Sequence, residues 1–478
     1  MEGRILATIF LFMIILVASP SPSSCARLNG FPTTYTLRDD GAIGYYGDQV
    51  AAATSNSFHD NEYGDVFATP NTFKEYYRPL ANRQTDDDLQ AFPDPWRSLA
   101  KSEFNVMNYG AVGNGQVDDT QAFLKAWGDV CGSTQGIPTL IIPKGNTFLL
   151  NSVEFKGPCK AASVNFQLSG NIVAPNNMNA WKDKDQWVQF DDVQGLIING
   201  GGQIDGQGQV WWKVCDTTNC QRPTALHISK CDGLRLSNIT HINSARNHIS
   251  ITDCNGVQIS DILIRAPDES PNTDGIDISA STNINIHNSF IGTGDDCIAI
   301  ISGSSHINIT DVMCGPGHGI SVGSLGKQGS YSTVEDVQVR NCTFNGTQNG
   351  ARIKTWQGGS GYARNISFED IIIQAAKNPI IIDQKYTDNL STGTGTGTGT
   401  LLDQENAVQV SDVTFRNIRG SVAGDTAITL DCDDKIGCKN IVMDRIDLTS
   451  SVPGKKVSAH CKNVKGLSTL LSPSVSCL

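Results

Sequence analysis

The chain has 478 residues, of which 39% are hydrophobic and 18% charged, so it carries enough apolar material for a large folded core. Its 48 acidic and 36 basic residues give a net charge of −12, which argues against a nucleic-acid-binding protein but allows a local basic site for an anion. Its 47 glycines follow no Gly-X-Y period, which excludes collagen. Length alone suggests about three domains, unless the chain is built from repeats.

The N-terminus has the pattern of an export signal. Arg4 precedes an apolar run over residues 5–18, which is too short to span a membrane but suits a signal core. Small residues at positions 24–26 favour cleavage after Ala26, so we expect residues 1–26 to be a signal peptide rather than a membrane anchor. After cleavage, we expect the mature protein to be secreted and released from the membrane. Residues 27–100 lack a clear period and are predicted to be a loosely ordered leader or pro-segment.

Secretion makes the 14 cysteines candidates for disulfides, and removal of Cys25 with the signal leaves at least one of them unpaired. No CxxC pair and no HExxH motif occurs, so no metal site is predicted. Six Asn-X-Ser/Thr sequons are candidate glycosylation sites: Asn238, Asn308, Asn341, Asn345, Asn365 and Asn389. The plausible short-range disulfides are Cys215–Cys220, Cys432–Cys438 and Cys461–Cys477.

After the leader, the sequence changes from one predicted helix to a long series of strands. Asp118-Asp119-Thr120 predicts the start of a helix whose apolar face holds Ala122, Phe123, Ala126, Trp127 and Val130. Beyond about residue 190, alternating apolar and polar segments begin at residues 234, 257, 284, 307, 337 and 413. A second short strand follows each, for example at 249–251, 276–278, 298–300 and 320–322. A Gly-Thr run at 393–399 is predicted to be a flexible insertion.

The repeat length identifies the architecture. The first five segments are 23 to 30 residues apart, which is typical of a β-solenoid because single turns cannot bury their apolar residues but stacked turns share one core. An antiparallel sandwich would not keep this register, and helical repeats would need longer amphipathic runs. We therefore predict an all-β fold, a right-handed parallel β-helix over residues 101–478, with a short helix covering its open N-terminal end.

Polar residues recur just before the second strands. Asp274, Asp296 and His318 are spaced by 22 residues, and Asp295 lies beside Asp296. Because stacked strands are about 4.8 Å apart, we expect these side chains to lie within a few ångströms of one another. Stacked carboxylates repel and raise at least one pKa, which a fold tolerates mainly where chemistry requires it. For one aspartate an ordinary turn residue would be the better interpretation, but not for the aligned set.

The following turn adds two cations. We expect Ile353 to align with the inward-facing Ile276, Ile298 and Ile320, so that Arg352 and Lys354 face outward beside the acids. Glycoside hydrolysis needs one carboxyl group as an acid and another as base or nucleophile. The cations indicate a negatively charged substrate such as a uronic-acid polymer. These residues alone leave open which aspartate is the acid, and whether the reaction retains or inverts configuration.

One competing motif needs comment. The segment at 319–323 matches the G-x-S-x-G pattern of serine hydrolases, which requires a strand-turn-helix context. Ser321 instead lies within a repeat strand that no helix follows, so a serine hydrolase is disfavoured.

The candidate residues lie in four short motifs: Asn272-Thr273-Asp274, Gly294-Asp295-Asp296, Gly317-His318-Gly319 and Arg352-Ile353-Lys354. These motifs resemble the signature of the polygalacturonases, family 28 of the glycoside hydrolases. They occur intact, in order and at family-like spacings, and the longer strings around them resemble the plant members. The resemblance extends from about Phe104 to the C-terminus but does not clearly cover residues 27–100, and the Gly-Thr insertion departs from the family pattern near Tyr386.

The resemblance implies an inverting hydrolase that cleaves the α-1,4-galacturonosyl linkages of polygalacturonan, or pectin, without a cofactor or metal. It implies that Asp295 is the general acid, that Asp274 and Asp296 activate water, and that His318 supports the acid. It also implies a disulfide between Cys297 and Cys314. Asn272, Arg352, Lys354 and Tyr386 are the implied substrate-binding residues.

We expect a monomeric enzyme of the cell wall that cleaves inside the polymer. The alternatives are an enzyme that acts from chain ends, a rhamnogalacturonan hydrolase, a calcium-dependent pectate lyase on the same fold, and an inactive solenoid that only binds the wall. Product sizes over time distinguish internal cleavage from action at chain ends. Chelation and unsaturated products identify a lyase, and a reducing-sugar assay on polygalacturonate identifies an inactive solenoid.

Overall fold

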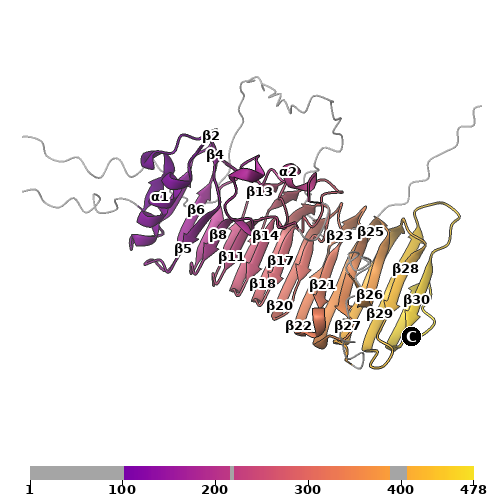
Figure 1. The fold of residues 1–478 in the computed structure, drawn as a ribbon. Coiled ribbons are helices and arrows are strands. Elements are labelled where there is room, and N and C mark those ends of the chain that lie inside the picture. Colours follow the sequence, from indigo (N-terminus) through magenta and orange to yellow (C-terminus); the bar gives the residue numbers. More distant parts are fainter. Residues whose placement is uncertain (1–101, 216–219, 388–405) are drawn as a thin grey trace, which may run out of the picture. The chain divides into compact units, whose positions relative to one another are not determined.

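The computed structural model describes residues 102–215, 220–387 and 406–478, and these are mostly β-strand (Figure 1). The expected signal peptide and leader, the sequon at Asn389 and the Gly-Thr run lie outside the described residues. In the described ranges, no helix combines the length and the apolar character that a membrane crossing requires.

The strands of the described ranges form two sheets in which neighbouring strands are parallel, as a coil that returns in the same direction requires. The first sheet has 11 strands: β5 (Val153–Lys156), β8 (Gln186–Asp191), β11 (Thr224–Ser229), β14 (Ile249–Thr252), β17 (Ile276–Ser279), β19 (Ile298–Ile300), β21 (Ile320–Leu325), β24 (Asn349–Trp356), β26 (Asn378–Tyr386), β28 (Thr426–Asp431) and β30 (Ser458–Lys462).

The second sheet, which wraps the remaining sides of the coil, has 20 strands within the same described ranges. They are β1 (Glu103–Asn105), β2 (Asn114–Asp118), β3 (Thr139–Ile142), β4 (Thr147–Leu149), β6 (Val164–Leu168), β7 (Asn171–Val173), β9 (Leu196–Asn199), β10 (Gln203–Asp205), β12 (Arg235–Ser237), β13 (Thr240–Ile242), β15 (Asn255–Ser260), β16 (Leu263–Arg265), β18 (Thr282–Gly292), β20 (Ser304–Cys314), β22 (Tyr331–Arg340), β23 (Thr343–Asn345), β25 (Ser360–Ala376), β27 (Gln409–Val422), β29 (Cys438–Ser450) and β31 (Val464–Ser472).

The register confirms the predicted parallel β-helix. Val257 pairs with Ile284, which pairs in turn with Ile307 and then Val337, so each of these predicted repeats lies one turn beyond the one before it. A turn that the sequence analysis missed begins at Ile366 in β25 and lies between the repeats at 337 and 413. This turn explains the long interval between those two repeats.

One predicted alignment is wrong by two residues. Ile276, Ile298 and Ile320 do stack, but the next residue in their row is Ala351. Ile353 continues the neighbouring row of Ile278, Ile300 and Val322, because β24 starts earlier than the motif suggests. A shift of two residues keeps the same side chains inside, so Arg352 and Lys354 still face outward as predicted.

The predicted helix is α1 (Thr120–Gly132), and it covers the first turns as expected (Figure 1). Its apolar face is buried, and the indole of Trp127 donates a hydrogen bond to the carbonyl of Lys156 in β5 at 3.1 Å. Asp118 caps the helix by accepting from the Thr120 N–H at 3.0 Å, whereas Asp119 turns back to the N–H groups of Val112 and Gly113. The other helices are short: α2 (Gln209–Trp212) and the 3-10 turns η1 (Val106–Tyr109), η2 (Met178–Ala180) and η3 (Lys327–Gly329).

Disulfides close loops at both ends and in the middle of the coil. The pairs predicted at Cys215–Cys220, Cys432–Cys438 and Cys461–Cys477 are present, as is the implied pair Cys297–Cys314. A fifth pair, Cys131–Cys159, joins the end of α1 to the loop after β5 and was not predicted. Cys231, Cys254 and Cys342 are buried free thiols among the described cysteines.

One inward position of the core holds a polar residue. His241 is fully buried in a row between Ile204 and Ile264, and neither of its ring nitrogens has a hydrogen-bond partner among the described residues. Burial, with a smaller effect of the neighbouring His248, holds the pKa of His241 well below its ordinary value. A neutral, unpaired imidazole of this kind lowers stability.

We expect His241→Ile to increase the free energy of unfolding by about 1–3 kcal/mol, because isoleucine matches the row and leaves no unpaired polar atom. The gain is larger at pH 5 than at pH 8, since the unfolded wild type binds a proton below its ordinary pKa and the folded protein does not. Urea unfolding of both proteins at both pH values measures this difference in the free energy of unfolding. Ile264→Val, the matched control, should lose about 0.5–1.5 kcal/mol equally at both. A destabilised His241→Ile protein would contradict the argument.

Candidate active site

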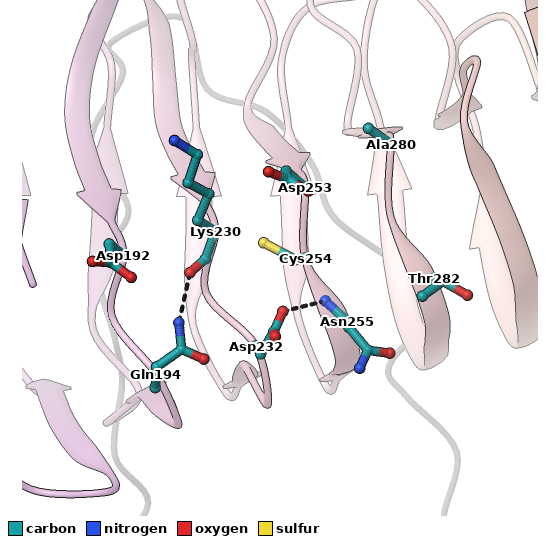
Figure 2. Close-up of a pocket in the computed structure, with 9 residues that line it drawn as sticks. All are labelled: Asp192, Gln194, Lys230, Asp232, Asp253, Cys254, Asn255, Ala280 and Thr282. Atoms are coloured by element: carbon teal, nitrogen blue, oxygen red, sulfur yellow. Dashed lines mark hydrogen bonds between the residues drawn. The ribbon is translucent and has the colours of Figure 1, made fainter. Parts of the chain in front are cut away.

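A polar hollow lies at one end of the strands of the 11-stranded sheet, away from the residues predicted to be catalytic (Figure 2). It is lined by residues that directly follow β8, β11, β14 and β17, among them Asp192, Lys230, Asp253 and Ala280. Its one thiol, Cys254, is buried, which raises the pKa of that group to about 11 and keeps it protonated. The residues predicted to be catalytic precede the strands and therefore lie at the opposite end.

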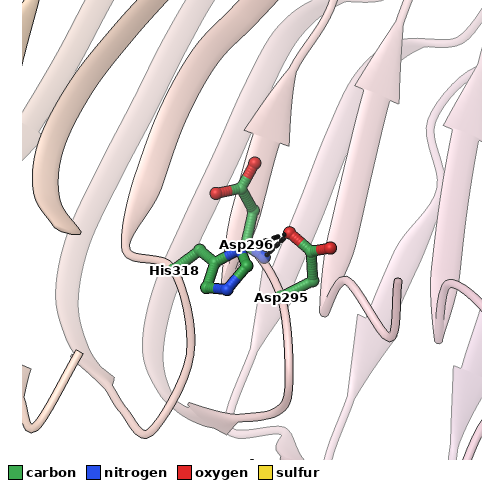
Figure 3. Close-up of side chains that lie close together, drawn as sticks. All are labelled: Asp295, Asp296 and His318. Atoms are coloured by element: carbon green, nitrogen blue, oxygen red, sulfur yellow. Dashed lines mark hydrogen bonds and ion pairs between the residues drawn. The ribbon is translucent and has the colours of Figure 1, made fainter. Parts of the chain in front are cut away.

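The structure brings together the predicted aspartates and histidine. Asp274 precedes β17, Asp295 and Asp296 precede β19, and His318 precedes β21. These three strands are consecutive in the sheet, with Ile276, Ile298 and Ile320 in register. Asp295, Asp296 and His318 each place a side-chain ligand atom within 4.8 Å of the others (Figure 3). The spacing argument from the sequence is therefore correct for this cluster.

Asp296 is the buried centre of the cluster. Its side chain is fully buried, Lys354 Nζ donates to Oδ2 at 2.7 Å, and Ser321 Oγ donates to Oδ1 at 2.7 Å. The Arg352 guanidinium lies 3.8 Å from Oδ1. Both carboxylate oxygens are thus engaged and the charge is balanced by adjacent cations. Ser321 serves here as a donor and lies within β21, the strand position that the sequence predicted for it.

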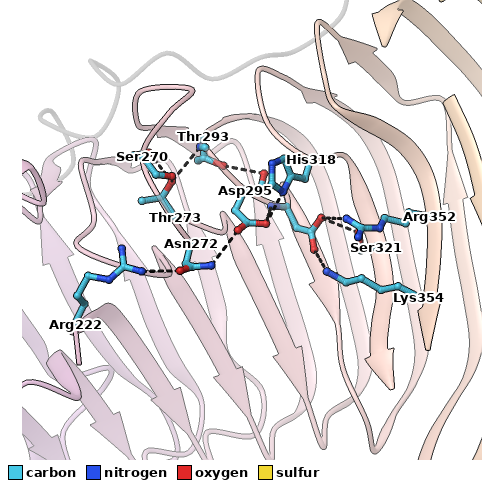
Figure 4. A network of polar contacts seen from close by, with 12 residues as sticks. Arg222, Ser270, Asn272, Thr273, Thr293, Asp295, His318, Ser321, Arg352 and Lys354 are labelled. Atoms are coloured by element: carbon cyan, nitrogen blue, oxygen red, sulfur yellow. Dashed lines mark hydrogen bonds and ion pairs between the residues drawn. The ribbon is translucent and has the colours of Figure 1, made fainter. Parts of the chain in front are cut away.

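Asp295 accepts three hydrogen bonds. His318 Nδ1 lies 2.8 Å from Oδ1, the Asp296 N–H donates to the same oxygen at 2.9 Å, and Asn272 Nδ2 donates to Oδ2 at 3.3 Å (Figure 4). Burial alone would raise the pKa of Asp295. The hydrogen bond and charge of His318, together with the charge of Lys354, outweigh burial and lower that pKa below its ordinary value.

The pKa of Asp274 shifts in the opposite direction. Burial, followed by the negative charge of Asp295, raises the pKa of Asp274 well above its ordinary value. Of the two carboxyl groups, Asp274 therefore holds a proton more tightly than Asp295 in the free protein. Because the two groups interact, they titrate as a pair and the proton can move when a new charge enters the site.

The sequence analysis missed a fourth acid. Asp277 faces outward in β17 in register with Ala299, one residue beyond the inward Ile276. Burial and the charge of Asp296 raise the pKa of Asp277 to about 7, and Asn247 Nδ2 donates to one of its oxygens. The alternation that placed Arg352 on the outer face would have placed Asp277 there as well, so the signal was present in the strand pattern.

We expect Asp277→Asn to stabilise the protein at pH 7 but not at pH 4. The pKa of this carboxyl group rises from about 4 in the unfolded chain to about 7 in the folded protein. The unfolded chain therefore loses this proton at lower pH than the folded protein does, and the free energy of unfolding decreases as pH increases between these values. At pH 7 this decrease amounts to roughly 1–4 kcal/mol. The asparagine amide keeps the oxygen that Asn247 contacts. Urea midpoints at the two pH values measure the difference, and an equal effect at both would show that Asp277 is not buried as an acid.

Cations and aromatic rings flank the acids on the side of the later turns. Arg352 and Lys354 both lie in β24, and each charged group is 5.4 Å from the ring centre of Tyr386 at the end of β26. The ring of Trp356 packs edge-on against Tyr386 at 5.3 Å. Tyr386 is therefore beside the predicted site, and Trp356 is a neighbour that the motifs did not indicate.

The ligand atoms of Asp295, Asp296 and His318 are close enough together to hold a metal ion. Asp296, however, already accepts from Lys354 and Ser321, and the ammonium group occupies the position of a counter-charge. The donor set of these residues therefore suits an internal ion pair better than a metal.

Comparisons with known proteins point to one family. Residues 131–477 match the model of the glycosyl hydrolases family 28. A probable polygalacturonase of Arabidopsis thaliana is 47% identical over 79% of this chain and 81% of its own length. Polygalacturonase-2 of Solanum lycopersicum is 38% identical over 82% of this chain and 88% of its own.

Solved structures share the fold. The endo-xylogalacturonan hydrolase of Aspergillus tubingensis superposes with a TM-score of 0.63 at 23% identity, covering 77% of this chain and 98% of that enzyme. Endopolygalacturonase I of Stereum purpureum, solved with two galacturonates, gives a TM-score of 0.52 at 22% identity, covering 70% of this chain and 95% of its own. At these identities the likeness supports the β-helix fold alone.

Proposed function

Because the chain belongs to family 28 of the glycosyl hydrolases, we propose that it hydrolyses α-1,4-galacturonosyl linkages of polygalacturonan, the backbone of pectin. The observation that carries the proposal is the gathering of Asp274, Asp295, Asp296 and His318 on one outer edge of the sheet, next to two cations. Carboxyl groups supply the acid and base of glycoside hydrolysis, and the cations match a substrate that carries one carboxylate per sugar.

We assign the general acid to Asp295. Its low pKa means that it is ionised in the free enzyme, so it must gain a proton when substrate binds. A galacturonate carboxylate entering the site adds a negative charge, which raises the pKa of nearby acids. Asp274, whose pKa is raised by burial and by the charge of Asp295, is the neighbouring acid from which that proton can come. The proton then passes from Asp295 to the oxygen of the leaving sugar.

Asp274 and Asp296 are assigned to activation of the attacking water. In keeping with the resemblance of the four motifs, we propose direct attack by water with inversion of configuration, in which Asp296, oriented by Lys354 and Ser321, acts as a base and forms no bond to the sugar. The carboxylate oxygens of Asp295 and Asp296 come within 4.8 Å of each other, which is closer than the about 6.5–9.5 Å usual for inverting pairs. The assignment of inversion therefore rests on the family resemblance and not on this distance.

Substrate binding is assigned to Asn272, Arg352, Lys354 and Tyr386. Arg352 is the stronger candidate for the sugar carboxylate, because its Nε is buried without a hydrogen-bond partner among the described residues. Lys354 is already paired with Asp296, so its first role is to hold that carboxylate. The Tyr386 ring beside both cations offers a flat surface on which a sugar can stack.

The N-terminal pattern supports secretion to the cell wall, where pectin is found, with cleavage after Ala26 and a monomeric enzyme of residues 101–478 following a leader. We also propose glycosylation at Asn238 and Asn345, which are exposed. The amides of Asn341 and Asn365 instead donate to aspartates of the preceding turn.

Purified protein incubated with polygalacturonate tests the proposal. We expect new reducing ends, no unsaturated products and unchanged rates with a chelator present. Internal cleavage, which we propose, gives oligomers of many sizes early, whereas action from chain ends gives only the smallest product. A calcium-dependent reaction with unsaturated products would identify a lyase, activity on rhamnogalacturonan alone would change the substrate, and binding without cleavage would indicate an inactive solenoid.

A further inference from the structure

A buried arginine lies on the other side of the acids from Arg352 and Lys354, and neither the motifs nor the mechanism above uses it. Arg222 is 6% exposed and lies just before β11, two residues after the Cys215–Cys220 disulfide. Its Nη1 donates to the carbonyls of Pro271 at 2.6 Å and Ala245 at 3.2 Å. Burial of such a charged side chain is costly, and these contacts with backbone carbonyls offset part of that cost.

Another donor of Arg222 reaches the site, whereas its buried Nε has no hydrogen-bond partner among the described residues. Its Nη2 donates to Asn272 Oδ1 at 2.6 Å, and Asn272 Nδ2 donates in turn to Asp295 Oδ2 at 3.3 Å (Figure 4). Asn272 itself is exposed and has a left-handed backbone, with φ of 52°. An exposed amide can rotate by half a turn about its last bond, which would direct its oxygen instead of its NH₂ group at the carboxylate.

We propose that Arg222 is a positioning residue for the reaction, which locks the Asn272 amide so that its NH₂ group faces Asp295. The guanidinium can accept no hydrogen bond, so it can bind only the amide oxygen, and this leaves one orientation for Asn272. Asp295 is then held from two sides, by Asn272 on Oδ2 and by His318 on Oδ1. The inference deepens the proposed function and rests on it.

Loss of Arg222 has two expected consequences. The carboxyl group of Asp295 loses a fixed partner, so that kcat falls about 10–100-fold, as is usual for misplacement of a reacting group, while KM, to which Asn272 contributes as a substrate-binding residue, rises by less. The pH dependence also shifts. Asp295 is surrounded by Asp274, Asp277, Asp296, His318 and Lys354, and removal of the Asn272 donor and of a nearby positive charge favours its protonated form. The limb of the pH–rate profile that reports Asp295 therefore moves to higher pH.

A double-mutant cycle separates this role from a merely structural one. We would measure kcat, KM and the pH profile on polygalacturonate for wild type, Arg222→Met, Asn272→Ala and the double variant, with thermal unfolding of each. If Arg222 acts through Asn272, the double variant loses no more kcat than Asn272→Ala alone. If Arg222→Met does not fold, Arg222→Lys replaces it in the same cycle, because lysine keeps the charge but cannot hold Pro271 and Asn272 together.

The outcomes are distinct. Coupled losses of kcat with a shifted pH profile support the proposal. The proposal would be overturned if the losses of kcat in the two single variants multiplied in the double variant, or if the pH–rate profile did not shift. An increase in KM without a loss of kcat would also overturn it, because Arg222 would then be a direct substrate ligand. Arg364→Met, which removes an exposed arginine paired with Glu335, is the control and should leave every parameter unchanged. Failure of the wild type to release reducing ends would reject the proposed function itself, whatever the cycle shows.

Discussion

Asp295→Asn is expected to lower kcat on polygalacturonate by about 10²–10⁴-fold, the range that general acid catalysis contributes, while the protein remains folded. Asparagine has the size of aspartate and can still accept from His318 or from the Asp296 N–H, so the surrounding network loses little. It cannot release a proton to the leaving oxygen. Kinetics and thermal unfolding of the variant measure both effects, and substantial activity in a folded variant would reject Asp295 as the acid.

The same experiment can decide between Asp295 and Asp274. Resemblance assigns the acid to Asp295, whereas in the free protein the pKa of Asp274 is raised and that of Asp295 is lowered. An aryl oligogalacturonide has a leaving group that needs no proton, so the variant lacking the acid should recover most of its rate on that substrate. Asp274→Asn, the matched variant, should remain slow on both substrates because it lacks part of the water-activating pair. If only Asp274→Asn recovered its rate on the aryl substrate, Asp274 would be the general acid and Asp295 would belong to the water-activating pair.

Lys354→Met is expected to have the second-largest effect, because it affects stability and catalysis together. Methionine fills much of the same volume but leaves Asp296, which is fully buried, without the ammonium group at 2.7 Å. Removing one partner of a buried ion pair costs about 3–5 kcal/mol, and the remaining carboxylate tends to take up a proton. A protonated Asp296 cannot act as a base, so kcat should fall at least 10²-fold.

Measurement of kcat and KM for Lys354→Met, with urea unfolding, tests this prediction. Arg352→Met is the matched control, because Arg352 lies at 3.8 Å from Asp296 and makes the weaker contact. It should raise KM more than it lowers kcat, as expected for a substrate ligand. If Lys354→Met raised only KM and left stability unchanged, Lys354 would be a substrate ligand and Asp296 would not depend on it.

The repeat made the fold and most of the site predictable. A period near 23–30 residues fixes which side chains stack, so the cluster of Asp274, Asp296 and His318 followed from spacing alone. Alternation within a strand also placed Arg352 and Lys354 correctly, even though Ile353 was aligned two residues from its true partners. Errors of two residues are harmless in this fold because side chains on a strand alternate with a period of two.

The rest depended on contacts between segments that no periodicity links. Arg222 lies in a loop outside the repeat, and its partner Asn272 is 50 residues away, so only the folded chain brings them together. The pKa of Asp274 and that of Asp295 move in opposite directions because of hydrogen bonds and burial, which the spacing cannot distinguish. Cys131–Cys159 likewise joins a helix to a loop across 28 residues with no motif to indicate it.

The most direct test of the proposed function is NMR of the first products released from polygalacturonate by the purified enzyme. Hydrolysis with inversion predicts that each new reducing end appears first as the β-anomer and then equilibrates to the mixture of anomers. It also predicts that no double bond forms. Initial release of the α-anomer would contradict the roles assigned to Asp274 and Asp296 by indicating a covalent intermediate, and a 4,5-unsaturated sugar would contradict hydrolysis itself.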